Sequence, residues 1–220
     1  MNDSSELGEN RGPFLALEGM DGSGKTTQVD LLSKWLISKN LKFTVAREPG
    51  STAIGEAIRG IVQESLDLNI PSETELLLYL AARSVFVQEV VVPVLDRGEI
   101  FLTDRFSMST LAYQGYARGL DITEVHRLNN FASGGLNADL YLVLDIPAEL
   151  SRERLALSNK EKDRLELSGT DFMQKVRLGY LDVSRKMKNA VVIDGTETPE
   201  IIHLKIIEIL TREMPATFGV

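Results

Sequence analysis

The sequence contains no cysteine and no long hydrophobic run. Without cysteine, the chain can form neither a disulfide framework nor a thiolate nucleophile, and it suits a reducing compartment. Its longest apolar runs, such as EVVVPVL at 89–95, are far shorter than the roughly 20 residues that a membrane-spanning helix needs. Residues 1–12 lack the basic and apolar segments of a signal peptide. We therefore predict a cytoplasmic protein without a membrane partner, in which residues 1–12 form a disordered leader.

Positive charge and histidine are also scarce. The chain has 24 Lys and Arg against 32 Asp and Glu, which gives a net charge of −8. A general nucleic-acid-binding protein would carry a basic face, so we predict no nucleic-acid partner. A polyanionic ligand would need basic residues gathered locally against this field. The two histidines, His126 and His203, have no partners at metal-ligand or catalytic-triad spacing, and we interpret both as structural.

The chain alternates between short apolar runs and segments with helical spacing. Such alternation is typical of an α/β fold in which a parallel sheet is covered by helices on both faces. We expect a five-stranded sheet in a single domain over 13–214. Ser72 and Asp121 are predicted helix N-caps, Glu75 stands at the capping-box position after Ser72, and Pro199 is predicted at the first turn of the last helix. The predicted strands are 13–19, 42–50, 99–105, 138–147 and 189–195, and the predicted helices are 24–40, 52–65, 72–92, 107–119, 121–135, 148–157, 170–188 and 199–214.

The stretch GMDGSGKTTQ, 19–28, joins the first strand to the first helix. It satisfies G-x-x-x-x-G-K-[ST], and its glycines allow backbone N–H groups to turn toward phosphate oxygens at a helix N-terminus. Lys25 would reach the β- and γ-phosphates, and Thr26 would ligate Mg²⁺. Asp104, at the end of the third strand, would hold a water bound to that Mg²⁺. The pattern predicts a site for a nucleoside triphosphate with Mg²⁺, formed by Gly19, Met20, Asp21, Gly22, Ser23, Gly24, Lys25, Thr26 and Thr27.

Two arginines follow neighbouring strands at the same edge of the sheet. Arg47 lies in AREPG at the end of the second strand, and Arg105 lies in TDR at the end of the third. Ligands of open parallel sheets bind beyond the carboxyl ends of the strands. A pair of guanidinium groups beside a phosphate-binding loop predicts a clamp for a second phosphate, carried by the acceptor.

Six segments, taken together, resemble thymidylate kinases in order and in spacing. They are FLALEGMDGSGKTTQ, AREPGST, LLLYLAARS, LTDRFSMSTLAYQGYARG, LYLVLDIP and KDRLE, and the resemblance extends from about Phe14 to Ile209. It implies an enzyme that transfers the γ-phosphoryl group of ATP to dTMP. It also implies a five-stranded parallel sheet, a mobile LID at about 152–168 and a homodimer.

The resemblance also implies roles for individual residues. Asp21 would lie near the sugar 3′-hydroxyl and the metal, and Arg47 and Arg105 would bind the dTMP phosphate beside Glu48 and Pro49. A cis peptide between Glu48 and Pro49 is predicted in this turn. The thymidine moiety would be recognised by side chains from two helices: Tyr79 stacking on the base, Arg83 donating to its O4, Thr110 and Gln114 completing the base edge, and Tyr113 filling the space of a 2′-hydroxyl.

One departure concerns the catalytic positive charge. Members of this family place a basic residue either in the P-loop or in the LID, and here the P-loop position is Ser23. The LID should therefore supply it. Arg164, in the DR-x-E pattern, is the favoured residue, and the alternatives are Arg152, Arg154, Lys160 and Lys162.

Two other functions remain open at this point. A GTPase-like binding switch would need N-K-x-D at a strand end, whereas NKEKD at 159–163 has one residue too many and lies in a polar loop. A deoxynucleoside kinase would use Glu48 as general base for a 5′-hydroxyl. Arg47 and the STLAYQG segment argue against that reading.

Overall fold

The computed structural model describes residues 11–158, 164–165 and 168–219. Its described part contains one sheet of five strands: β1 (Phe14–Gly19), β2 (Phe43–Arg47), β3 (Ile100–Asp104), β4 (Leu140–Asp145) and β5 (Ala190–Asp194). The order across the sheet is β2-β3-β1-β4-β5, and every neighbouring pair is parallel. Both the strand positions and the parallel arrangement confirm the sequence prediction.

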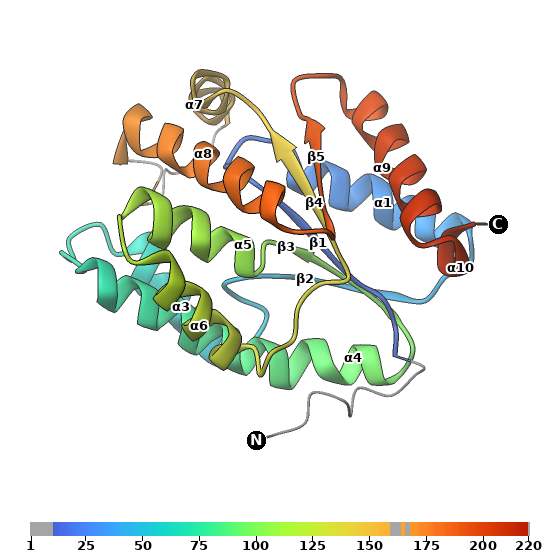
Figure 1. Ribbon diagram of the computed structural model, residues 1–220, viewed down its shortest axis with the longest axis horizontal. Helices are drawn as coiled ribbons and strands as arrows, with labels where there is room; N and C mark the ends of the chain where they lie inside the picture. The colour runs from blue at the N-terminus through green and yellow to red at the C-terminus, as the bar shows by residue number, and fades with distance from the viewer. Residues whose placement is uncertain (1–10, 159–163, 166–167, 220) are drawn as a thin grey trace.

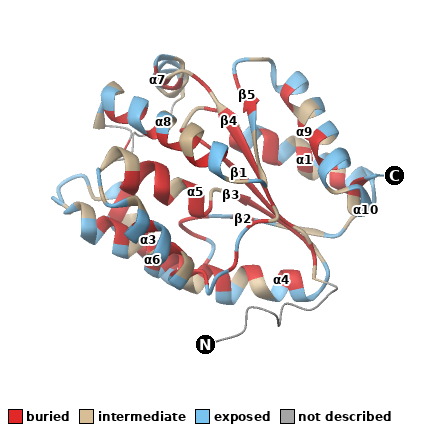
Figure 2. Ribbon diagram, viewed as in Figure 1, coloured by how far each residue is buried: buried red, intermediate tan, exposed pale blue. Residues whose placement is uncertain are grey.

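The two faces of β1 belong to two separate hydrophobic clusters. Phe14 and Ala16 face one side, and Leu15 and Leu17 face the other, as the period of a strand requires. The side with Leu15 and Leu17 is covered by α1 (Lys25–Ser38), α9 (Pro199–Glu213) and α10 (Pro215–Phe218). Red, buried positions run along all of β1 in Figure 2, because helices close the sheet on both sides. The sheet is therefore the middle layer of a three-layer sandwich (Figure 1).

The remaining described helices lie on the Phe14 side or at the carboxyl edge of the sheet. A single 25-residue helix runs from Ser72 to Asp96. Its parts are α3 (Ser72–Phe86), η2 (Val87–Val91, π-helical) and α4 (Val92–Asp96). The others are α2 (Ala53–Arg59) with η1 (Gly60–Glu64), α5 (Ser107–Thr110) with η3 (Leu111–Ala117), α6 (Ile122–Ala132), α7 (Ala148–Leu157) and α8 (Thr170–Lys186). They match the segments expected from helical spacing, except that the long helix was predicted to end at 92 and continues through α4 to Asp96.

Length and composition alone would allow the Ser72–Asp96 helix to cross a membrane, which no single apolar run in the sequence suggested. Its packing gives another account. Leu76, Leu80 and Phe86 belong to the main hydrophobic cluster, and Glu75 and Arg83 are buried in polar contacts inside the protein. This helix is apolar because it forms part of the core.

Two local predictions were wrong. The N-cap of α3 is Pro71 and not Ser72, and no side chain caps this helix end. Glu75 does not reach back to the helix terminus because its carboxylate is turned into the protein. The predicted leader is also too long: the Gly12 N–H donates to the Leu95 carbonyl, and Arg11 pairs with Asp139. The cap at Asp121 and Pro199 in the first turn of α9 are confirmed.

Candidate active site

The P-loop connects β1 to α1 in a conformation that its glycines make possible. Gly19 has φ 131°, and a Cβ there would stand 2.4 Å from the Leu144 carbonyl oxygen of the neighbouring strand. Gly24, with φ 98°, is the N-cap of α1. The buried Lys25 ammonium donates to the Met20 carbonyl at 3.0 Å and so curls over the loop. Burial lowers the pKa of Lys25, and the positive charge of Arg105 lowers it further.

A hydroxyl and a carboxylate lie close together beside this loop. Thr26 Oγ1 lies 3.3 Å from Asp104 Oδ2, and Asp104 Oδ1 is buried without a partner among the described residues. Hydroxyl and carboxylate oxygens are the ligands that Mg²⁺ prefers, and phosphate oxygens usually complete its shell. The described residues include no cluster of three or more acidic, His or Cys side chains that would hold a metal alone. This pair therefore suits Mg²⁺ that arrives with a nucleotide.

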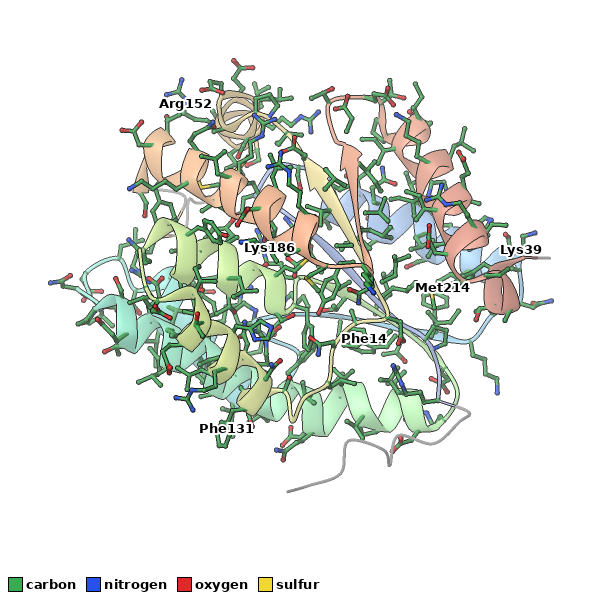
Figure 3. The ribbon with its side chains drawn as sticks, in the orientation of Figure 1. Phe14, Lys39, Phe131, Arg152, Lys186 and Met214 are labelled. Carbon is green, nitrogen blue, oxygen red and sulfur yellow. The ribbon has the colours of Figure 1, made fainter. Side chains whose placement is uncertain are left out.

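Helix α7 holds the P-loop from the β4 side. Ser151 Oγ donates to the Asp21 carbonyl at 2.7 Å. Arg154 donates to the carbonyls of Gly22 and Gly195, both at 3.2 Å. Arg152, by contrast, is exposed on the outer side of α7 (Figure 3). Among the described basic residues of the predicted LID, Arg154 is therefore the one that contacts the P-loop.

A cleft lies beside the P-loop, and polar and aromatic side chains form most of its lining. Its wall is built from the P-loop, the turn after β2, η1, α3, the turn after β3, α5 and η3, with one residue from the predicted LID. These residues are Asp21, Glu48, Pro49, Gln63, Tyr79, Arg83, Arg105, Ser109, Thr110, Tyr113, Gln114 and Leu165. Nine of the ten residues predicted to bind the acceptor are therefore brought together, and Arg47 is the exception.

Arg105 links the P-loop to this cleft. It follows β3 with φ 75°, and its guanidinium donates to the Gly19 carbonyl at 2.9 Å and to Asp21 at 2.5 Å. Tyr113 donates its hydroxyl to the other oxygen of Asp21 at 2.9 Å. Burial raises the pKa of Asp21, but the charges of Arg105 and Lys25 outweigh burial and hold that pKa well below its usual range. Asp21 is therefore ionised at neutral pH, beside a guanidinium that can turn to an anion.

Arg83 is fixed at the far end of the cleft. It forms an ion pair with Glu48 at 2.8 Å, both side chains being 3% exposed, and donates to Thr110 at 2.8 Å and to Asn129 at 2.5 Å. Burial raises the pKa of Glu48, although Arg83 opposes this. The Glu48–Pro49 bond is cis, as predicted. Glu48 is thus committed to holding Arg83, which disfavours it as a general base.

Two predicted phosphate ligands do not line the cleft. Arg47 ends β2, its side chain is 57% exposed, and it pairs with Glu56 at 3.3 Å. Arg164 is not beside the P-loop, because its guanidinium pairs with Glu75 on α3 and its Nε donates to the Val62 carbonyl at 3.0 Å. Lys160 and Lys162 lie outside the described residues. Ser23 is fully buried, in keeping with a P-loop position that carries no charge.

Several residues of the site were missed by the sequence analysis. Glu18 is fully buried beneath the P-loop and accepts hydrogen bonds from Phe106 N, Ser109 Oγ and Tyr180 Oη at 2.8, 2.6 and 3.1 Å. The sequence could have indicated Glu18, because an acidic residue inside the apolar strand FLALEG is unusual. Asn129 and Tyr180 had none, because their contribution depends on which helices pack over the cleft.

Comparison with known proteins gives a consistent result. The profile of the thymidylate kinase family matches residues 17–206. A thymidylate kinase from Thermosipho melanesiensis is 44% identical over 197 residues, which cover 90% of this chain and 96% of that protein. One from Thermosipho africanus is 44% identical over 201 residues, with 91% and 98% covered. One from Desulforudis audaxviator is 47% identical over 174 residues, with 79% and 78% covered.

Proposed function

The chain belongs to the thymidylate kinase family, and from that membership we propose how its side chains carry out phosphoryl transfer. The reaction moves the γ-phosphoryl group of ATP to dTMP and yields dTDP and ADP. One observation carries the assignment. Asp21 and Arg105 join the P-loop to the cleft through a 2.5 Å contact, so a donor on the loop and an acceptor in the cleft would meet there.

On the donor side, the backbone of 19–27 would hold the ATP phosphates. Lys25 would exchange its contact with the Met20 carbonyl for phosphate oxygens, since a carbonyl is a weaker partner than an anion. Thr26 directly and Asp104 through water would hold Mg²⁺. When bound, Mg²⁺ supplies neutralisation of charge on the β- and γ-phosphates.

On the acceptor side, Arg105 would turn from Asp21 to the dTMP phosphate, and Arg47 would swing in from the rim. Tyr79 would stack on thymine, with Arg83 and Thr110 at its O4 edge and Gln114 completing the base edge. Asp21 and Tyr113 would border the sugar, with the Tyr113 ring where a 2′-hydroxyl would stand. An ionised phosphate needs no base to attack, so the work of these groups is positioning and charge neutralisation.

The LID, 152–168, of which 159–163 and 166–167 lie outside the described residues, would supply the remaining positive charge. Arg164 can do so only by leaving Glu75. Arg154 needs a smaller movement, because it already donates to the Gly22 carbonyl. We therefore propose Arg154 beside Arg164 as the residue to test first.

A homodimer is also part of the proposal. Exposed apolar side chains lie on three helices that pack side by side: Ile54 on α2, Leu77 on α3 and Phe131 on α6, exposed by 51, 59 and 84%. Phe131 projects from α6 in Figure 3. Analytical ultracentrifugation of the protein and of a Phe131→Asp variant tests this. A monomer at all micromolar concentrations contradicts it. The cytoplasm, which supplies ATP, is the proposed location.

A coupled assay for ADP with dTMP, thymidine and dCMP in parallel tests the activity and the site. We expect rapid turnover with dTMP alone, because Arg83 as a donor suits thymine O4 and opposes the amine of dCMP. A misplaced buried donor costs about 1–3 kcal/mol or more. Turnover of thymidine would favour a deoxynucleoside kinase. Comparable kcat/KM for dCMP and dTMP would refute the base assignments.

A further inference from the structure

Glu75 accepts hydrogen bonds from three side chains in two separate parts of the chain. It lies on α3, one turn before Tyr79, and is fully buried. Its Oε1 accepts from Gln114 Nε2 at 2.8 Å, and Arg118 donates to both of its oxygens at 3.2 and 3.1 Å. Arg164 pairs with it as well. One carboxylate thus joins the base end of the cleft to the 164–165 segment of the predicted LID.

These donors keep Glu75 charged. Burial raises the pKa of Glu75, but hydrogen bonds from Arg118, Gln114 and Arg164 outweigh burial and lower that pKa. The carboxylate is therefore ionised at neutral pH and can only accept hydrogen bonds.

An acceptor at this place fixes the orientation of the Gln114 amide. The NH₂ group must face Glu75, because the amide oxygen would repel the carboxylate. The Gln114 Oε1 is then left on the cleft side, and none of the residues that the structure describes donates to it. A pyrimidine with N–H at N3, such as thymine, can donate to this oxygen. Cytosine carries a bare lone pair at N3 and cannot.

The same carboxylate also holds a segment that borders the cleft. Arg164 is held by Glu75, and its backbone N–H donates to the Gln63 carbonyl at 3.0 Å. The next residue, Leu165, is 5% exposed and lines the cleft together with Gln63. The base end is therefore bordered by a segment that Glu75 holds through Arg164.

We propose that Glu75 is a specificity-determining positioning residue: it locks the Gln114 amide with its oxygen toward the base and holds the 164–165 segment over the cleft, so that pyrimidines with N3–H are selected. The inference rests on the proposed function, since it takes the cleft as the acceptor site. Glu75 itself does not touch the substrate.

Glu75→Gln is the test, because it keeps the size and removes the charge. A glutamine at position 75 can donate to the Gln114 oxygen, so the Gln114 amide can flip. Its NH₂ group would then face the cleft and could donate to N3 of cytosine. The ratio of kcat/KM for dTMP to that for dCMP should fall at least about tenfold, within the range for one mismatched buried hydrogen bond. The KM for dTMP should rise more than kcat falls. Glu73→Gln, an exposed position on α3, is the matched control and should change neither.

If Glu75→Gln does not fold, Glu75→Asp replaces it, since it keeps a charge for the two arginines but draws back from Gln114. The ratio should fall here too. In a Gln114→Met background, changing Glu75 should no longer alter the ratio. An unchanged ratio in the folded Glu75 variant, with ATP affinity intact, overturns the proposal. A wild-type enzyme that uses dCMP as well as dTMP instead overturns the acceptor-site assignment.

Discussion

At the scale of single residues, four carboxylates around the cleft differ in the direction of their pKa shift because they differ in cationic partners. Asp21 and Glu75 are each met by positive side chains that outweigh burial, and the pKa of each is lowered. Glu18 and Glu48 are buried with fewer such partners, and the pKa of each is raised. Burial alone therefore does not decide the ionisation of an acid in this site.

Glu18 should make stability fall as pH rises above about 4.5. Burial raises the pKa of Glu18 above its unfolded value, so between the two values the folded chain keeps a proton that the unfolded chain has lost. Rising pH then favours unfolding. Glu18→Gln removes this contribution, and its Tm should decline less than that of the wild type from pH 4.5 upward. Scanning calorimetry over pH 4–8 measures this, and parallel profiles would contradict it.

Substitution of either arginine of the phosphate clamp should weaken dTMP binding, but only the substitution of Arg105 should also lower stability substantially. Arg105 is 15% exposed and ion-paired, so Arg105→Ala should cost about 3 kcal/mol of unfolding free energy as well as raise the dTMP KM and lower kcat. Arg47 has only an exposed pair with Glu56, so Arg47→Ala should change stability by at most about 1 kcal/mol while still raising the dTMP KM. Urea unfolding and steady-state kinetics test both.

ATP binding should not depend on either arginine of the clamp. The affinity for ATP, measured by calorimetry without dTMP, should stay within a few-fold of the wild-type value in both variants. A large loss in Arg105→Ala would place this residue on the donor side.

At the scale of elements, a close contact between α8 and η3 supports one wall of the cleft. Gly179 of α8 packs against η3, where a Cβ would stand 2.9 Å from Tyr116 Cβ and 3.0 Å from Ala112 Cα. Gly179→Ala should force the two helices apart, cost about 1–3 kcal/mol, and raise the dTMP KM because η3 carries Tyr113 and Gln114. Thermal unfolding and kinetics test this.

Gly60 gives the matched control. It lies in η1 with helical φ, and a Cβ there meets only Glu64 Oε2 at 3.9 Å. Gly60→Ala should stabilise by about 0.4–1 kcal/mol. Equal destabilisation of both variants would show that the α8–η3 contact has no special role.

The sequence predicted the elements well and their partners less well. Strands and helices follow from local period, which is why all five strands were located. Glu75 shows where local reasoning ends: its spacing from Ser72 fits a capping box, but its carboxylate is used by Gln114, Arg118 and Arg164, which are far away in sequence. Arg164 was predicted to be the LID residue that supplies the catalytic positive charge for the same reason, since only packing reveals the competing acid.

At the scale of the whole molecule, the acceptor should stabilise the fold by mass action. At about 100 times its Kd, dTMP contributes roughly 2.7 kcal/mol, which corresponds to a rise in Tm of about 5–10 °C for a chain of this size. Thymidine at the same concentration should give a smaller rise, because it offers no phosphate to Arg105. Equal shifts in a thermal scan would argue against the phosphate clamp.

The central place of β1 has a consequence for synthesis on the ribosome. β1 is made first, yet it pairs only with β3 and β4, whose residues begin at Ile100 and Leu140. At roughly 5–20 residues per second, the nascent chain waits on the order of ten seconds before this apolar strand can find a neighbour. During that interval FLALEG needs protection by the exit tunnel or by a chaperone. Slowing translation between β1 and β3 should therefore increase aggregation of the newborn protein, although the finished enzyme would be unchanged.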